Sequence, residues 1–163
     1  MRCCFLLMLL VFTTNTSSWA NKTELYEGTA TRDGHLVYKE YHTVKFDKSG
    51  KVLSAETEYK DPDGNLLVKL HSDFTLRLSS PDHIQTNLNF NESYGVKTIN
   101  NEITLFTKKE GQAEKTKKVN VDDHEEIVVG CQGLHYYLIE HLKELKNKNE
   151  LPVTFLVPGS LGF

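Results

Sequence analysis

The sequence predicts a mainly β fold (β-rich α+β): a curved antiparallel sheet or incomplete β-barrel of about 8–10 strands, with one C-terminal amphipathic helix packed against it. Three observations predict this fold. Apolar and polar residues alternate along most of residues 25–119, as they do in half-buried strands. Turn sequences such as Asp33-Gly34 and "DPDG" at residues 61–64 separate the alternating runs. Beyond Asp122 the apolar period changes to that of a helix.

The alternation is clearest in "HLVYKEYHTVKF", residues 35–46, where the even positions share one face of the predicted strand. The other predicted strands are 25–32, 52–59, 65–71, 74–80, 83–90, 94–99, 103–109 and 115–121. Within residues 52–59, Leu53, Ala55, Thr57 and Tyr59 are expected on one side. There is no internal repeat and no low-complexity linker, so residues 21–163 are expected to form a single β-rich domain.

Helical signals begin at Asp123, which has the capping-box spacing to Glu126 and predicts a single turn of helix there. The clear helix follows, because apolar positions recur at the helical spacing and are expected to pack on the sheet. These positions are Leu134, Tyr137, Leu138, His141, Leu142 and Leu145. The run "LPVTFLV", residues 151–157, predicts a final strand that returns to the sheet.

The first 20 residues predict a secretory signal peptide. Arg2 is followed by ten apolar residues, Cys3–Phe12, and small residues stand at Ser18 and Ala20 of the expected cleavage site. The apolar run is shorter than the roughly 20 residues that cross a bilayer. The chain is therefore expected to be exported, periplasmic or secreted, with no transmembrane segment after cleavage and Cys131 as its one remaining cysteine.

The charge balance is mildly acidic, with 19 basic and 22 acidic residues and a formal net charge of −3. This balance does not fit a nucleic-acid-binding protein, which carries a strongly basic surface. Five lysines gather in residues 107–118. Acidic residues dilute them, which favours a solvated hairpin tip over a binding site for an anionic partner. No motif for a cofactor is present, so none is expected.

The sequence contains two candidate catalytic groups, and each also has a structural explanation. Cys131 stands at a predicted helix start with His135 one turn away, but a third group to orient the histidine is missing. Residues 122–126, "DDHEE", concentrate four carboxylates and a histidine in no recognised metal-binding spacing. Neither group is therefore predicted to be catalytic or to bind metal. A hydrolase that uses Cys131 and His135, or the Asp122–Glu126 carboxylates, remains the alternative hypothesis.

Glu40 and His42 are polar residues on the otherwise apolar face of the strand at 35–46. Either they line a ligand cavity and form a mutual or ligand hydrogen bond, or the strand overhangs its sheet at this point. The helix is expected to cover one opening of the sheet and to contribute to the same site. The predicted ligand-binding residues are Tyr38, Glu40, His42, His135, Tyr137 and His141.

Four segments carry a resemblance to a known group of proteins: "LVYKEYH", "YKDPDGNLLVK", "GLHYYLIEHLKEL" and "LPVTFLVP". With these segments the chain resembles an uncharacterised family of exported bacterial proteins of unknown function. The resemblance implies a bacterial periplasmic or secreted setting and a curved antiparallel sheet, with more chain after the final strand than "PGSLGF" provides. It implies no activity and no site residues.

Together these patterns predict an exported protein that binds rather than catalyses. Its expected partner is an apolar small molecule or lipid, or another component of the cell envelope, held by a curved sheet with an apolar interior. A purely structural envelope role is the third possibility.

Overall fold

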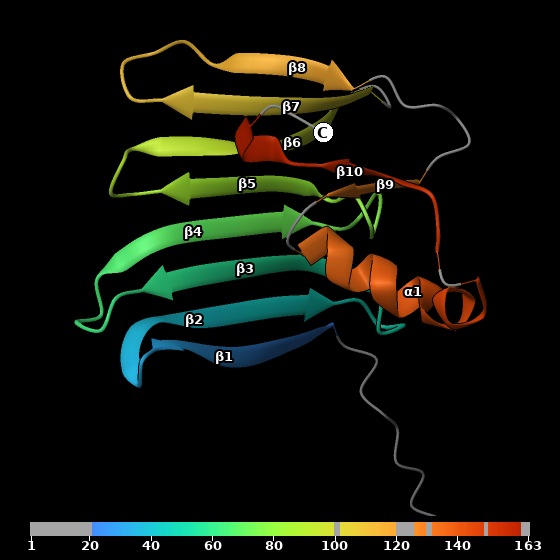
Figure 1. Ribbon diagram of the computed structural model, residues 1–163, viewed down its shortest axis with the longest axis horizontal. Helices are drawn as coiled ribbons and strands as arrows, with labels where there is room; N and C mark the ends of the chain where they lie inside the picture. The colour runs from blue at the N-terminus through green and yellow to red at the C-terminus, as the bar shows by residue number, and fades with distance from the viewer. Residues whose placement is uncertain (1–20, 100–101, 120–125, 130–131, 149, 161–163) are drawn as a thin grey trace, which may run out of the picture.

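The computed structural model describes residues 21–99, 102–119, 126–129, 132–148 and 150–160. Within these residues, eight antiparallel strands follow one another in chain order across a single twisted sheet (Figure 1). The strands are β1 (Lys22–Arg32), β2 (His35–Phe46), β3 (Val52–Lys60), β4 (Leu66–Asp73), β5 (Asp82–Asn87), β6 (Glu92–Ile99), β7 (Glu102–Lys109) and β8 (Lys115–Val119). Each strand pairs with its sequence neighbours, as short hairpin connections require.

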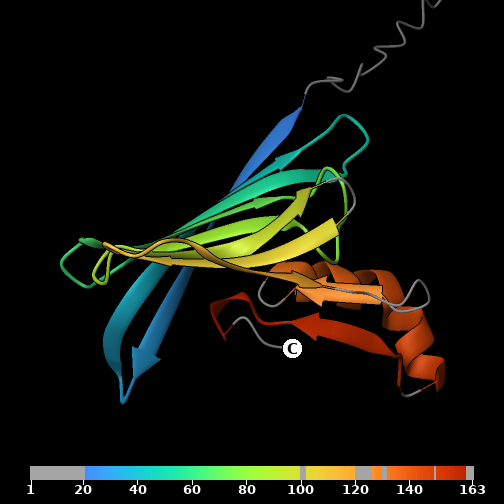
Figure 2. The ribbon, with the colours of Figure 1, turned by 90° about the horizontal axis from the view of Figure 1, so that it is seen from above.

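A smaller layer completes the fold. It consists of β9 (Glu126–Val129), α1 (Gln132–Lys148), β10 (Val153–Leu156) and the short 3₁₀ helix η1 (Pro158–Ser160). β9 and β10 pair in parallel, which requires a crossover connection, and α1 provides it. Viewed from above, this layer lies on one face of the large sheet (Figure 2). The predicted fold class is confirmed. The sheet is open, since its edge strands β1 and β8 do not pair with each other to close a barrel.

None of the described helices is long and apolar enough to span a bilayer. The predicted signal peptide, residues 1–20, lies outside the described residues.

The strand register assigns every side chain to one of two faces. We call the face that carries α1, β9 and β10 the inner face. Two rows of inner-face residues run across the strands at mid-length. The first row is Glu24, Val44, Ala55, Ser72, His83, Val96 and Leu105, and the second is Gly28, Glu40, Tyr59, Val68, Asn87 and Glu92. The first row lies next to the small layer. The second row lies toward the opposite end of the sheet, where the β1–β2, β3–β4 and β5–β6 turns lie (Figure 1).

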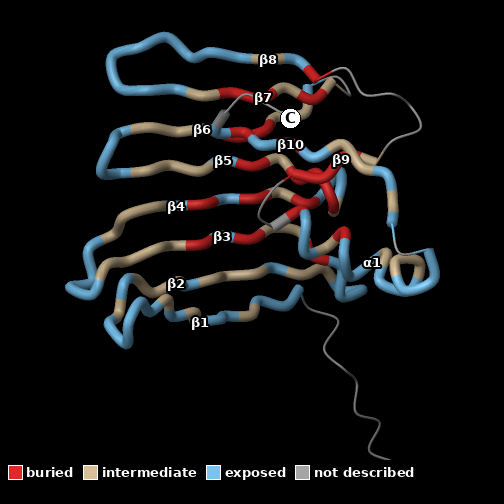
Figure 3. The backbone as a smooth tube through the Cα atoms, viewed as in Figure 1, coloured by how far each residue is buried: buried red, intermediate tan, exposed pale blue. Residues whose placement is uncertain are grey.

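The small layer buries only the half of the inner face that lies next to it (Figure 3). One buried cluster joins β6, β7 and β8 to β9 and β10 through Val96, Leu105, Val129 and Leu156, among others. A second cluster, around Phe74, joins β2, β3 and the connection after β4 to α1. In this cluster the rings of Phe74 and Tyr136 meet edge to face, 4.7 Å between centroids.

The outer face is solvated and charged. Lys39 pairs with Glu27, and Lys60 and Lys69 pair with Glu58, with each of these side chains about one-third exposed or more. Near β6 and β7 the ring of Phe106 lies over Gly95, which has no side chain to block it, and Lys97 lies 4.1 Å above the ring centroid. The two faces therefore differ in composition as a half-buried sheet should.

Two local predictions were wrong. Residues 74–80 are not a strand, because the Asp73 carboxylate accepts hydrogen bonds from the backbone and hydroxyl of Thr75 and turns the chain out of the sheet. In β3, Val52 is buried with Ala55 in place of Leu53, because the register shifts at Lys45 and Phe46. The helical turn predicted from Asp123 falls on residues outside the described part of the chain, and the Glu126–Val129 segment after it forms strand β9, as its β-branched Ile-Val-Val favours.

The helix forms where the sequence predicts it, but it does not bury its leucines. Tyr137 is buried and His141 is half-buried, whereas Leu134, Leu138 and Leu142 are all exposed. The reason lies at the start of α1, where Gly133 packs so closely on the carbonyl of Ser79 that an added Cβ would lie 2.2 Å from it. This contact turns the glycine and tyrosine side of the helix toward the sheet.

Phe74 and Leu76 test where the core ends. Phe74→Ala should lower the free energy of unfolding by about 3–5 kcal/mol, because a fully buried ring is removed from the contact with α1. Leu76→Ala is the matched control, since this side chain is 68 % exposed and its loss should change the value by less than about 0.5 kcal/mol. Urea denaturation followed by far-ultraviolet circular dichroism measures the free energy of unfolding of both variants. Equal losses in the two variants would contradict the described core.

Candidate functional site

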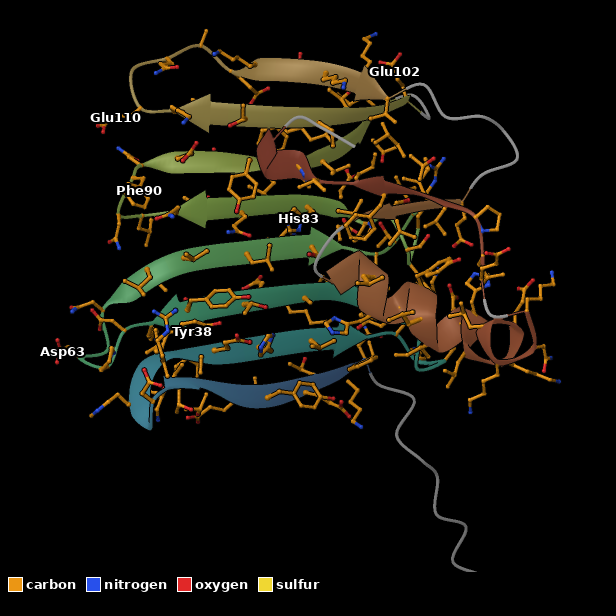
Figure 4. All side chains as sticks on the ribbon, in the orientation of Figure 1. Tyr38, Asp63, His83, Phe90, Glu102 and Glu110 are labelled. Carbon is orange, nitrogen blue, oxygen red and sulfur yellow. The ribbon has the colours of Figure 1, made fainter. Side chains whose placement is uncertain are left out.

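The uncovered half of the inner face contains three of the six predicted site residues, Tyr38, Glu40 and His42. We call the following set of half-buried side chains the open patch. It consists of Tyr38, Glu40, His42, Tyr59, Val68 and Tyr94. β2, β3, β4 and β6 supply these side chains, and strand register places them on the inner face. In Figure 4, Tyr38 lies toward the end of the sheet that is away from α1, and His83 lies nearer to α1.

Hydrogen bonds link three side chains of β2 and β3, Glu40, His42 and Thr57, which we call the polar trio. His42 Nε2 lies 2.9 Å from Glu40 Oε2, and His42 Nδ1 lies 2.9 Å from the hydroxyl of Thr57. Both β1 and β3 pair with β2 at these positions, so the strand does not overhang its sheet here. The mutual hydrogen bond that a cavity-lining pair requires is present. Whether the pair contacts a ligand stays a prediction.

The chain has the carboxylate–imidazole–hydroxyl order of a hydrolytic triad, but Thr57 is poorly placed to act as a nucleophile. Its side chain is only 1 % exposed, and it lies in the middle of the sheet between Leu70 and His42. A nucleophile must reach the substrate. The arrangement instead fixes the orientation of the imidazole and leaves Glu40 and His42 about one-quarter exposed on the sheet surface. The trio is suited to hold a polar group.

Aromatic rings flank this polar trio. Tyr38 and Tyr59 meet edge to face with centroids 5.6 Å apart, a favoured geometry for ring pairs. Val68 stands opposite Tyr59, and Asn87 and Gln85 continue the face across β5 toward Tyr94. There the ring of Tyr94 lies beside Gly159 of η1, which marks the boundary of the uncovered half. The open patch thus combines apolar ring surface with hydrogen-bonding groups.

The three predicted residues of α1 do not join the open patch. His135 is exposed and Tyr137 is buried under the helix. His141 has its Nε2 2.8 Å from Glu126 of β9 and its Nδ1 3.3 Å from Glu144, and its ring lies 4.5 Å from that of Tyr137. Burial, followed by the negative charges of Glu126 and Glu144, raises the pKa of Tyr137. These contacts fasten α1 to β9, which is a structural role.

Among the described residues, no hydrogen bond, ion pair or ring contact joins the helical group to the group on β2. The structure therefore places the six predicted side chains in two separate groups, and a single ligand site that joins them stays a prediction.

The catalytic alternative falls partly outside the described residues, because Cys131 and residues 122–125 lie there. Of the side chains that the structure places, no three His, Cys, Asp or Glu come together as a metal site would require. His135 and Glu126 are described, and they belong to the exposed side of α1 and to the His141 contact respectively.

Two hollows lie away from the open patch. One, of about 540 Å³, lies at the start of β1 and is bordered by Glu24, Phe46 and Asp47. The other, of about 370 Å³, is bordered mainly by outer-face residues of β3, β4 and β5. Charged side chains border both, and on the outer face Glu56 and His71 face one another at 3.8 Å. Both hollows are shallow and open to solvent, unlike the enclosed clefts typical of small-molecule sites.

Comparison with known proteins gave no match to a family model, to a curated protein or to a solved structure. Function is therefore inferred from the geometry of the open patch, and the resemblance to exported bacterial proteins stays a prediction.

Sequence reasoning missed His83, the most buried titratable group near the site. It lies on β5 beside the covered half, 2 % exposed, with its Nδ1 3.4 Å from the Ser72 hydroxyl. Burial lowers the pKa of His83 from 6.5 to about 4. The sequence predicts residues 83–90 as one strand without an assignment of His83 to the inner face, and the strand ends earlier, at Asn87. A histidine directly after Ser79-Ser80-Pro81-Asp82 gives no signal of burial.

His83 should make stability depend on pH. Because the pKa of the folded state lies below the ordinary value of 6.5, the unfolded chain binds more protons, and stability falls as pH drops from 6.5 toward 4. We expect this residue to contribute a loss of about 2 kcal/mol between pH 7 and pH 5. His83→Gln should remove that part of the pH dependence in urea denaturation. A wild-type-like slope in the variant would show that His83 is not buried uncharged.

Proposed function

We propose that this protein is an exported, non-enzymatic binding module that holds a lipid-like, amphipathic ligand against the open patch. The observation that carries the proposal is the composition of the uncovered half of the inner face. It presents tyrosine rings and Val68 around a hydrogen-bonded Glu40–His42 pair. The outer face of the same strands presents lysine–glutamate pairs instead.

The rings of Tyr38 and Tyr59 give the open patch its apolar surface. Both are half-buried, so a flat or extended apolar body laid on them would remove further ring surface from water. Burial of apolar surface contributes roughly 25 cal/mol per Å². The hydroxyl groups keep the same surface compatible with water when it is unoccupied, which fits a protein that binds and releases.

The polar trio supplies orientation. His42 is held on one side by Glu40 and on the other by Thr57, so its ring cannot rotate freely. A fixed donor or acceptor within an apolar surface selects ligands that carry a matching polar group. The ligand class that fits is therefore a molecule with an apolar body and one hydrogen-bonding end. The predicted export, with residues 1–20 as signal peptide, is part of the same proposal and would bring the module to the cell envelope.

Binding can be measured with N-phenyl-1-naphthylamine, a neutral apolar fluorophore, followed by displacement with a lysophospholipid. The double variant Tyr38→Ala/Tyr59→Ala should raise the Kd at least tenfold, because two adjoining rings are lost. Tyr41→Ala is the matched control: it removes a tyrosine from the outer face of the same strand, where Lys60 lies 5.0 Å from its ring. This variant should bind as the wild type does.

Native mass spectrometry of the protein exported into a bacterial periplasm gives an independent test. A bound mass that is lost on denaturation, and absent from the Tyr38→Ala/Tyr59→Ala variant, is the expected result. Binding of the fluorophore that is equal in the wild type, in this variant and in Tyr41→Ala would place the ligand elsewhere and overturn the proposal.

A further inference from the structure

We propose that the outward face of α1 docks onto the surface of an anionic phospholipid membrane. The face consists of four large apolar side chains and two lysines, namely Leu134, Leu138, Ile139, Leu142, Lys143 and Lys146. We call it the α1 docking face. It is distinct from the open patch and does not depend on the function proposed for that patch.

Exposure shows that the described part of the chain leaves much of this apolar surface uncovered. Leu134, Leu138 and Leu142 follow one another at intervals of four residues and are 36 %, 42 % and 52 % exposed, and Ile139 is 69 % exposed. Residues at this spacing form one stripe along a helix. Solvent-facing positions of a helix are ordinarily polar. The helix is held instead by its other side, through Gly133, Tyr137 and His141.

Charge identifies the kind of partner. Successive helix residues are about 100° apart around the axis. The half of the helix circumference that contains the leucines therefore also contains His135, Lys143 and Lys146, and it contains no acidic residue. Glu140 and Glu144 lie on the opposite side, where Glu144 is occupied by His141 and Lys148. An apolar stripe edged by lysines, on a chain whose net charge is −3, is complementary to an anionic and apolar surface.

The size and place of the face favour a membrane over a second protein. The exposed fractions of its four apolar residues amount to about two whole side chains, on the order of a few hundred Å². A standard protein interface buries about 800 Å² on each partner. Figures 1 and 2 show α1 at the periphery, with its C-terminal turns beyond the ends of the β1–β3 strands, so a flat surface can reach it.

The other lysine-rich segment, residues 107–118 in the β7–β8 hairpin, lacks these properties. Lys109 pairs with Glu92 and Lys118 pairs with Glu102. Large exposed apolar side chains, as the structure describes them, do not occur between Ile99 and Leu134. This hairpin therefore provides a control with comparable charge and no apolar stripe.

Co-sedimentation with vesicles tests the proposal. The full mature protein should bind vesicles of 70 % phosphatidylcholine and 30 % phosphatidylglycerol at least tenfold more tightly than vesicles of phosphatidylcholine alone, because each lysine near an anionic surface contributes to binding. Leu138→Ser/Leu142→Ser and Lys143→Gln/Lys146→Gln should each weaken that binding at least tenfold. Lys108→Gln/Lys115→Gln, which removes the same charge from exposed positions of the hairpin, should change it less than twofold.

Three results would overturn the proposal. These are equal binding to both vesicle types, an equal loss in the hairpin control, or a dimer in sedimentation velocity that Leu138→Ser/Leu142→Ser dissociates. The last result would assign the face to a second copy of the chain. Because the substituted side chains are exposed, thermal unfolding should stay unchanged and report intact folding. Tyr38→Ala/Tyr59→Ala should keep full vesicle binding, so this inference and the open-patch proposal can fail separately.

Discussion

The junction at Ser79 is the contact on which the arrangement of the molecule depends. Its carbonyl accepts a hydrogen bond from the backbone of Val129, at 2.9 Å, and leaves room beside it for Gly133 alone. The end of β9 and the start of α1 are thereby fixed to the connection between β4 and β5. A residue larger than glycine would collide with a backbone carbonyl, which cannot move aside as a flexible side chain can. The small layer is therefore held at one end of the sheet.

This placement produces the two surfaces from which function is inferred. Because β9, α1 and β10 cover only the half of the inner face that contains Phe74 and Leu105, the half that contains Tyr38 and Tyr59 is left accessible. Because Gly133 and Tyr137 turn one side of α1 inward, its leucines face outward. Both surfaces are consequences of one close approach between backbone segments, and neither requires a special conformation of its own.

The sequence was sufficient to predict what depends on local pattern. Alternation and the turn at Asp61–Gly64 predicted the strands, and the helical period predicted α1, since these signals are short-range. It could not predict which side of α1 packs, because the Ser79–Gly133 contact joins residues 54 positions apart. A Glu40–His42 hydrogen bond was one of two alternatives that the sequence left open, because both residues lie on one strand face. The burial of His83 was missed because it depends on tertiary packing, which a local sequence pattern does not encode.

The two proposed surfaces lie on the same side of the sheet, and this has a mechanistic consequence. α1 packs on the inner face, and the open patch is the uncovered part of that same face. A protein seated on a membrane through α1 would keep the tyrosines of β2 and β3 on the membrane-proximal side rather than behind eight strands. An amphipathic ligand could then pass between bilayer and open patch over a short path. Binding of N-phenyl-1-naphthylamine from solution would be unaffected by α1 substitutions. Extraction of a ligand from vesicles would require both the open patch and the α1 docking face.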